Sequence, residues 1–148
     1  MKARRRVMII GAVGSGKSSL VLALFGDRGQ AAKTQALEFR DWIIDTPGEY
    51  SENPFHYKSL MVTAQEAGLL LMVQDATRER NYFPPGFSTG FPIPAIGVIT
   101  KCDHPDADVP RARELLKQSL VEGEIFVTSA VTGEGIAELK TKLQSLLE

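Results

Sequence analysis

The sequence contains one cysteine, one tryptophan and no long apolar run, and its charges nearly cancel. A single cysteine, Cys102, can form neither an internal disulfide nor a cysteine metal cluster, which is typical of a protein of the reducing cytosol. No apolar run approaches the roughly 18 residues that suggest a membrane span. With 17 basic and 18 acidic residues, the chain lacks the basic excess that neutralises a nucleic-acid backbone. We therefore expect a cytoplasmic protein that neither spans a membrane nor binds nucleic acid.

What is present is the composition of one ordinary globular domain. The chain has 148 residues, of which 43% are hydrophobic and 24% are charged. This length buries a sizeable core without a disulfide or a structural metal. We find no repeat, low-complexity tract or interdomain linker, so residues 1–148 are predicted to form a single domain.

Short apolar runs alternate with amphipathic segments along the chain. This alternation predicts an α/β fold in three layers, with a mainly parallel central sheet of about six strands and helices on both faces. Strands are expected at residues 7–10, 36–39, 42–44, 69–73, 95–99 and 125–127. Helices are expected at residues 17–25, 54–67 and 108–121, the last of these with Leu115, Leu116 and Leu120 inward, and in a final segment with Ile136, Leu139, Leu143, Leu146 and Leu147 on its apolar face.

The segment from Gly11 to Ser18 matches the phosphate-loop pattern G-x-x-x-x-G-K-S/T between a strand and a helix. Glycines let the backbone curl so that several N–H groups point inward at an anion, and the dipole of the following helix adds attraction. Lys17 is expected to reach the β- and γ-phosphates, and Ser18 to bind Mg²⁺. The nucleotide-binding residues predicted here are Gly11, Val13, Gly14, Ser15, Gly16, Lys17, Ser18 and Ser19.

A second acidic element follows the expected strand at residues 42–44. Asp45 ends this strand, and an aspartate there, beside a phosphate loop, typically lies on the Mg²⁺ side of a nucleotide. Gly48 allows a backbone N–H to approach a γ-phosphate. Thr34, in the intervening loop, is expected to close on Mg²⁺ when that phosphate is present. The predicted metal-binding residues are thus Ser18, Thr34 and Asp45.

Two further motifs complete a set of five elements that occur in order between Gly11 and Ala130. They are Thr100-Lys101-Cys102-Asp103 and Thr128-Ser129-Ala130. The whole set resembles the Ras-like GTPases, which have a P-loop NTPase fold. The resemblance implies that GTP or GDP is the ligand, bound with Mg²⁺.

The resemblance also assigns the base-recognition residues. It implies that Asp103 accepts hydrogen bonds from guanine N1–H and the exocyclic amine, that Lys101 packs over the base, and that the Ser129–Ala130 backbone contacts O6. Adenine lacks that donor pair and would leave the carboxylate unpaired. Thr100 replaces the commoner asparagine, and its hydroxyl can still tie this loop to the phosphate loop.

Two longer phrases narrow the resemblance. They are Lys-Thr-Gln-Ala-Leu-Glu-Phe at residues 33–39 and Ile-Asp-Thr-Pro-Gly-Glu-Tyr at residues 44–50. Both are similar to the EutP/PduV family, small GTPase-like proteins linked to ethanolamine and propanediol utilisation in bacteria. This similarity implies an association with bacterial microcompartments, with a shell or enzyme protein as the partner.

Three positions differ from the Ras-like pattern and bear on catalysis. Glu49 stands where many GTPases carry a glutamine that orients the attacking water, and its carboxylate repels the γ-phosphate. Val13 stands where glycine is common and would crowd an arginine finger supplied by a partner, and Gly14 stands where some potassium-activated relatives use asparagine. We therefore expect slow hydrolysis. The catalytic candidates are Lys17, Thr34, Gly48 and Glu49.

Three functions remain open. The first is a GTP-binding switch or slow GTPase, in which γ-phosphate contacts to Thr34 and Gly48 order two loops that a partner recognises. The second is a phosphotransferase, similar to an acetate kinase, that moves the γ-phosphoryl group from ATP or GTP to a small metabolite. The third is a nucleotide-binding scaffold without chemistry that captures a partner through residues 82–94. The proline-rich segment at residues 78–94 is expected to be mostly irregular, with at most one helical turn. Its Phe83, Phe87 and Phe91 either form an exposed patch or fold back onto the core.

Overall fold

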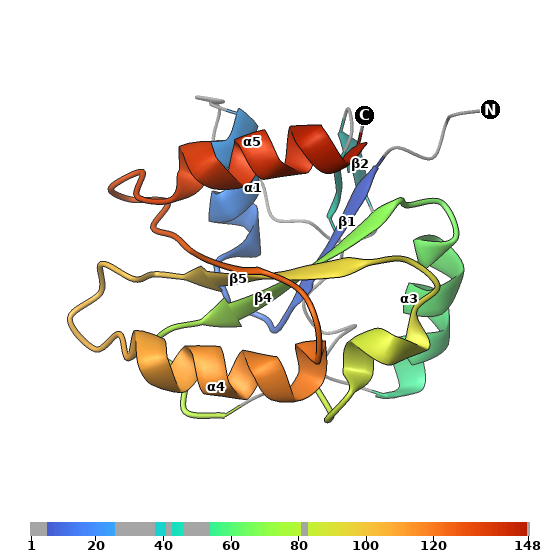
Figure 1. Ribbon diagram of the computed structural model, residues 1–148, viewed down its shortest axis with the longest axis horizontal. Coiled ribbons are helices and arrows are strands. Elements are labelled where there is room, and N and C mark those ends of the chain that lie inside the picture. The colour runs from blue at the N-terminus through green and yellow to red at the C-terminus, as the bar shows by residue number, and fades with distance from the viewer. Residues whose placement is uncertain (1–5, 26–37, 41–42, 46–53, 81–82, 148) are drawn as a thin grey trace.

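Six strands form one twisted sheet in the order β2-β3-β1-β4-β5-β6 (Figure 1). The computed structural model describes residues 6–25, 38–40, 43–45, 54–80 and 83–147. Every neighbouring pair of strands is parallel except β2 and β3, which are antiparallel. The mainly parallel α/β sheet that the sequence predicts is confirmed. The strands are β1 (Val7–Gly11), β2 (Glu38–Arg40), β3 (Ile43–Asp45), β4 (Leu69–Asp75), β5 (Ala95–Thr100) and β6 (Ile125–Val127).

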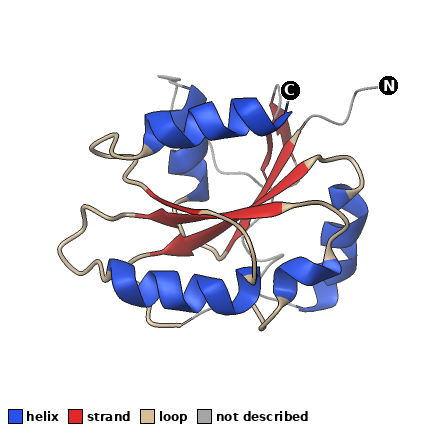
Figure 2. Ribbon diagram, in the orientation of Figure 1, coloured by secondary structure: helices blue, strands red, loops and turns tan. Residues whose placement is uncertain are grey.

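Helices cover both faces of the sheet (Figure 2). Helices α1 (Lys17–Phe25) and α5 (Ile136–Leu147) lie on one face, and α3 (Tyr57–Ala64) and α4 (Val109–Leu120) lie on the other. Two short 3-10 helices, η1 (Pro54–His56) and η2 (Phe87–Gly90), complete the described elements. Within the described ranges, no helix combines the length and apolar character that crossing a bilayer requires.

The alternating side chains of β1 divide the core into two parts. Met8 and Ile10 pack into the cluster beneath α3 and α4, whereas Val7 and Ile9 pack into the cluster beneath α1 and α5. All residues of β1 and β4 are buried, as expected for parallel strands covered on both faces. The apolar runs at residues 7–10 and 69–73 therefore mark the centre of the sheet.

Several element boundaries differ from the sequence-based expectation. The strands expected at 36–39 and 42–44 are β2 and β3, and each ends one residue later than expected. Residues 36–37 and 41–42 lie outside the described ranges. The helix expected at 54–67 begins as η1 and ends at Ala64. It ends there because the N–H groups of residues 65–67 bond to the third preceding carbonyl, which tightens the chain into a turn before β4.

The aromatic residues of the proline-rich segment are buried, so the hypothesis of an exposed partner patch is wrong for them. Phe83, Phe87 and Phe91 are 4%, 8% and 6% exposed and belong to the core beneath α4. Their rings contact one another, with Phe87 between the other two at 5.2 Å from each centroid. The Ser88 hydroxyl donates a hydrogen bond to the Leu120 carbonyl oxygen at 2.7 Å, which joins this segment to α4. The segment folds back onto the core because burial removes three large apolar rings from water.

Single side chains at two helices also depart from the expectation. On α4 the buried face is Ala112, Leu116 and Leu120, and Leu115 is only partly buried because it lies one residue, or about 100°, away from Leu116. On α5 the buried residues are Ile136, Leu139 and Leu143, whereas Leu146 is 45% exposed. The side chain of Leu147 lies outside the description. Asp108 caps α4, since its carboxylate accepts the Arg111 N–H at 3.1 Å.

Candidate functional site

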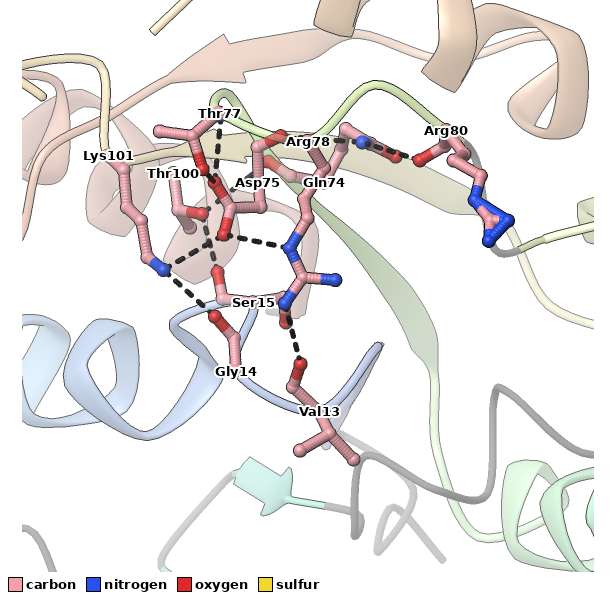
Figure 3. A network of polar contacts seen from close by, with 10 residues as sticks. All are labelled: Val13, Gly14, Ser15, Gln74, Asp75, Thr77, Arg78, Arg80, Thr100 and Lys101. Carbon is pink, nitrogen blue, oxygen red and sulfur yellow. Dashed lines mark hydrogen bonds and ion pairs between the residues drawn. The ribbon is translucent and has the colours of Figure 1, made fainter. Parts of the chain in front are cut away.

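The carboxyl ends of β1, β4 and β5 lie at one edge of the sheet, and the segments that leave them meet there (Figure 3). Strand β1 is a topological switch point, because β3 lies on one side of it and β4 on the other. Open α/β sheets bind ligands outside the carboxyl ends of strands at such a point. The predicted phosphate loop leaves β1 at this position.

The phosphate loop is curled as its glycine pattern predicts. Gly14 and Gly16 have φ angles of +78° and +97°, which favour glycine because a side chain is strained there. The Ser15 N–H donates to the Ala12 carbonyl at 3.0 Å and closes a turn. The ammonium of Lys17, which is 8% exposed, donates to the Gly11 carbonyl at 3.2 Å and so lies within the loop.

Three consecutive carbonyl groups of this loop accept hydrogen bonds from side chains at the ends of β4 and β5 (Figure 3). The three peptide groups between Val13 and Gly16 are therefore held from outside the loop. The donors are Arg78 Nη2 to the Val13 carbonyl at 3.1 Å, Lys101 Nζ to the Gly14 carbonyl at 2.9 Å, and Thr100 Oγ1 to the Ser15 carbonyl at 2.6 Å.

The Thr100 bond is the tie that the sequence predicts between the base-recognition loop and the phosphate loop. Thr100 is the last residue of β5 and is 4% exposed. Because the hydroxyl is buried, water does not compete for its hydrogen bond to the Ser15 carbonyl. Lys101 follows with a φ angle of +64°, an uncommon conformation for a residue with a side chain. Such conformations concentrate at functional sites, where surrounding contacts maintain them.

Asp75 is a site residue that the sequence-based reasoning missed. Its side chain is 2% exposed, and it accepts hydrogen bonds from Lys101 Nζ at 2.8 Å, from the Thr77 N–H at 2.8 Å and from the Thr77 hydroxyl at 2.6 Å. Arg78 Nε lies 3.8 Å from the same carboxylate. Strand β4 continues two residues past Val73, the partner of Gly11, so Asp75 comes level with the loop. The signal was present, since a strand-terminal aspartate was the argument already applied to Asp45.

The charge of Asp75 makes a testable contribution to stability. Burial raises the pKa of Asp75, but hydrogen bonds from Lys101 and Thr77 together with the Lys101 charge outweigh it, and the pKa lies below its ordinary value. A carboxyl group with a depressed pKa stabilises the fold above its unfolded pKa and loses this contribution as pH falls through the folded pKa. We expect Asp75→Asn to lower the free energy of unfolding by about 1–2 kcal/mol at pH 7 and to flatten its decline below about pH 4. Urea unfolding at several pH values measures both.

The matched control for this prediction is Asp106→Asn, which removes an exposed carboxylate from the loop after β5. It should leave the free energy of unfolding at pH 7 within about 0.5 kcal/mol of the wild type. If the free energy of unfolding of Asp75→Asn declined in acid as steeply as that of the wild type, the Asp75 carboxylate would not be the cause of the pH dependence.

Four of the residues predicted to recognise the base line a pocket of about 280 Å³ beside the phosphate loop: Thr100, Lys101, Asp103 and Ala130. Asp103 stands at this pocket, and one of its oxygens accepts the Ser129 hydroxyl at 2.7 Å. The Ser129 oxygen in turn accepts the N–H groups of Val131 and Thr132 at 3.2 and 3.0 Å. The loops after β5 and β6 are thereby joined. Six of the predicted nucleotide-binding residues line the pocket together: Gly16, Ser19, Thr100, Lys101, Asp103 and Ala130.

Cys102, the single cysteine, is half-buried. Burial raises the pKa of its thiol, and a hydrogen bond to the Glu134 carboxylate, at 3.5 Å from Sγ, raises it further. The nearby charges of Glu134 and Asp103 act in the same direction. Because only the thiolate is a good nucleophile, this environment disfavours a reactive cysteine.

The predicted switch residues are only partly within the described ranges. Thr34, Gly48 and Glu49 lie outside them, and of Asp45 only the backbone is described, at the end of β3 opposite Ile9 of β1. Ser18 lies in the first turn of α1, at the same edge of the sheet. A hydroxyl and a carboxylate are hard oxygen donors of the kind that Mg²⁺ takes beside a phosphate. Among the described residues, no three His, Cys, Asp or Glu side chains form a metal cluster.

Comparison with known proteins places the chain in a family. A family model described as ethanolamine utilisation – propanediol utilisation matches residues 4–145. A protein of Escherichia coli strain K12 named "Probable acetate kinase EutP" is 38% identical over 144 residues, which cover 96% of this chain and 91% of that protein. The propanediol utilization protein PduV of Citrobacter freundii is 36% identical over 138 residues, which cover 91% of this chain and 90% of that protein.

A solved structure extends the comparison to the fold. The G domain of FeoB from Methanococcus jannaschii superimposes with a TM-score of 0.66 at 21% identity and covers 99% of both chains. At this identity the likeness concerns the fold alone, and it identifies the fold as that of a P-loop G domain. The sequence-derived family and fold class are both confirmed. The chain belongs to the PduV–EutP family of small P-loop proteins, which is linked to ethanolamine and propanediol utilisation.

Proposed function

We propose that residues 1–148 form a single Mg²⁺-dependent, GTP-binding domain that hydrolyses GTP slowly. The observation that carries this proposal is the Asp103 carboxylate, held by Ser129, in a pocket that begins at Gly16 of the phosphate loop. A carboxylate in this position offers two acceptors to the N1–H and amine of guanine, and adenine has no matching donor pair. One pocket thus joins a base-selective acceptor to a loop suited to phosphates.

Different groups of the phosphate loop would hold the phosphates in different ways. Its backbone N–H groups and the first turn of α1 attract the anion, and Lys17 adds a positive charge from within the loop. Ser18, Thr34 and Asp45 are the residues proposed to hold Mg²⁺. When bound, the ion neutralises charge on the β- and γ-phosphates.

Slow turnover follows from Glu49, which we propose to stand beside the γ-phosphate where other GTPases place a glutamine. A carboxylate there repels the phosphate rather than orienting water. We further propose a cytoplasmic protein that acts with a shell or enzyme protein of a bacterial microcompartment. The family's link to ethanolamine and propanediol utilisation supports this setting.

A second candidate is transfer of the γ-phosphoryl group to acetate. The name of the Escherichia coli relative, "Probable acetate kinase EutP", favours it. An ionised carboxylate acceptor needs no general base, so the absence of a glutamine after Gly48 would not impair it. The scaffold hypothesis loses the aromatic part of its proposed capture segment at residues 82–94, because Phe83, Phe87 and Phe91 are buried.

Nucleotide titration of the wild-type protein with GTP, GDP and ATP, each with and without Mg²⁺, tests the proposal. We expect GTP to bind at least about 100-fold more tightly than ATP, because adenine leaves the Asp103 carboxylate unpaired. Mg²⁺ should strengthen triphosphate binding. Equal affinities for ATP and GTP would overturn the base assignment.

The same preparation separates the two chemistries. Phosphate release from GTP is measured with and without acetate, and acetyl phosphate is assayed directly. Slow release that acetate does not change supports hydrolysis. Formation of acetyl phosphate at the expense of free phosphate would instead establish the transferase.

A further inference from the structure

We propose that Arg78 is a positioning residue of the phosphate loop, an inference that rests on the proposed nucleotide binding. Arg78 follows β4, outside every motif that the sequence analysis identified. Its Nη2 donates to the Val13 carbonyl at 3.1 Å across 65 positions of sequence. It is the first of the three outside donors that hold consecutive carbonyls of the loop, and the other two, Thr100 and Lys101, belong to the base-recognition motif (Figure 3).

Holding these carbonyls orients the N–H groups that a phosphate would use. In a trans peptide the carbonyl and the following N–H point in opposite directions, and no described peptide bond is cis. Fixing the Val13 carbonyl toward Arg78 therefore directs the Gly14 N–H to the opposite side. Thr100 does the same for the Gly16 N–H through the Ser15 carbonyl. Arg78 thus presets one donor of the anion nest before a ligand arrives.

The guanidinium packs directly on the loop backbone. A Cβ atom built on Gly14 would lie 3.2 Å from Arg78 Nη2, so the guanidinium sits against the glycine itself. The Arg78 side chain is 33% exposed, and its Nε faces the Asp75 carboxylate at 3.8 Å. Asp75 is itself anchored by both the N–H and the hydroxyl of Thr77. The guanidinium is therefore held on one side by β4 and on the other by the loop.

The chemistry of arginine suits this position. Its planar fork carries several donors in fixed directions, so one side chain can face Val13 and Asp75 together, whereas lysine offers a point charge. Arg78 and Lys101 share the single carboxylate of Asp75. The cluster of these three residues keeps one net positive charge behind the loop, and this charge favours an anionic ligand over a neutral one.

The test compares Arg78→Ala with Arg80→Ala, which removes an arginine two positions along the same segment. Each protein is titrated with GTP and Mg²⁺, and then with guanosine by competition against fluorescent GDP. We expect Arg78→Ala to weaken GTP binding by about tenfold, because the Gly14 N–H is then no longer preset and the loop must be ordered as the ligand binds. Guanosine has no phosphate, so its affinity should stay within about twofold of that of the wild type. Arg80→Ala should leave both affinities within about twofold.

The outcomes separate this inference from the proposed function. Wild-type protein that binds neither GTP nor guanosine overturns the proposed function. Wild-type protein that binds GTP, with Arg78→Ala binding it equally well, overturns only the role of Arg78. Equal losses of GTP and guanosine affinity in Arg78→Ala would show a general structural defect and would also overturn the positioning role of Arg78. If Arg78→Ala does not fold, Arg78→Met, which keeps the length of the stem, must show the same phosphate-selective loss.

Discussion

Asp103→Asn is expected to weaken GTP binding by about 100-fold, which corresponds to losing a charge-assisted pair of hydrogen bonds. An amide keeps one acceptor oxygen but replaces the other with an NH₂ donor, which opposes the guanine amine. Xanthine carries a carbonyl oxygen where guanine carries that amine. The same substitution should therefore improve the binding of xanthosine triphosphate and invert the preference between the two nucleotides. Titration of both proteins with both nucleotides measures the inversion.

The geometry around Asp103 makes this a test of the base rather than of folding. The Ser129 hydroxyl can still donate to the amide oxygen, so the tie between the loops after β5 and β6 is retained. Asp106→Asn is the matched control, because it removes a carboxylate three positions away in the same loop and should change neither affinity. If Asp103→Asn weakened GTP and xanthosine triphosphate equally, Asp103 would have a structural role and the assignment of guanine would fail.

Gly135→Ala is expected to lower the free energy of unfolding by about 3 kcal/mol more than Gly133→Ala does. Both glycines have left-handed backbones, with φ angles of +75° and +87°. A Cβ at Gly135 would meet the Val127 carbonyl oxygen at 2.1 Å, whereas a Cβ at Gly133 would have nothing within 4 Å. Both alanine variants therefore lose about 1 kcal/mol of stability to the strained backbone conformation. Only Gly135→Ala adds a steric overlap.

Thermal and urea unfolding of both variants measure this difference. For a chain of this length we expect the midpoint of Gly135→Ala to lie roughly 10 °C below that of Gly133→Ala. The overlap is with the last residue of β6, directly before the Thr128–Ala130 loop, so Gly135→Ala should also weaken guanosine binding. Two variants of equal stability would mean that the start of α5 can move away from β6 without cost.

The fold was predictable from the sequence because its apolar patterns are short-range and strong. The runs at 7–10, 69–73 and 95–99 have no polar face, so they favour parallel strands covered on both sides, which β1, β4 and β5 are. Boundaries were less predictable. Strand β4 ends at Asp75 rather than Val73, since hydrogen bonding to its neighbours continues where the hydrophobic pattern stops.

The candidate site was predictable where a local motif carries its chemistry. The loop from Gly11 to Ser18 needs glycine at particular backbone angles, and Asp103 lies in a four-residue phrase, so both can be recognised without contacts. Arg78 carries no such pattern, and Asp75 carries only its place at the end of an apolar strand. Arg78 contacts the loop across 65 positions, and Asp75 contacts Lys101 across 26.

The position of the proline-rich segment was also not predictable from the sequence. Its composition was compatible both with an exposed aromatic patch and with a segment folded onto the core. The choice depended on whether α4 presents a surface that accepts Phe83, Phe87 and Phe91, and no local pattern encodes that surface. Contacts with distant elements, such as the bond from Ser88 to Leu120, decided it.

The sequence by itself determined the fold class and the phosphate loop, because both depend on local spacing and backbone preference. Its resemblance to known proteins indicated the family and the residues proposed to read the base. Only the tertiary structure decided which side chains hold that loop from behind. The carboxyl ends of β4 and β5 are brought to the loop by the order of strands in the sheet, and hydrogen bonds to Val13, Gly14 and Ser15 form only once that order exists.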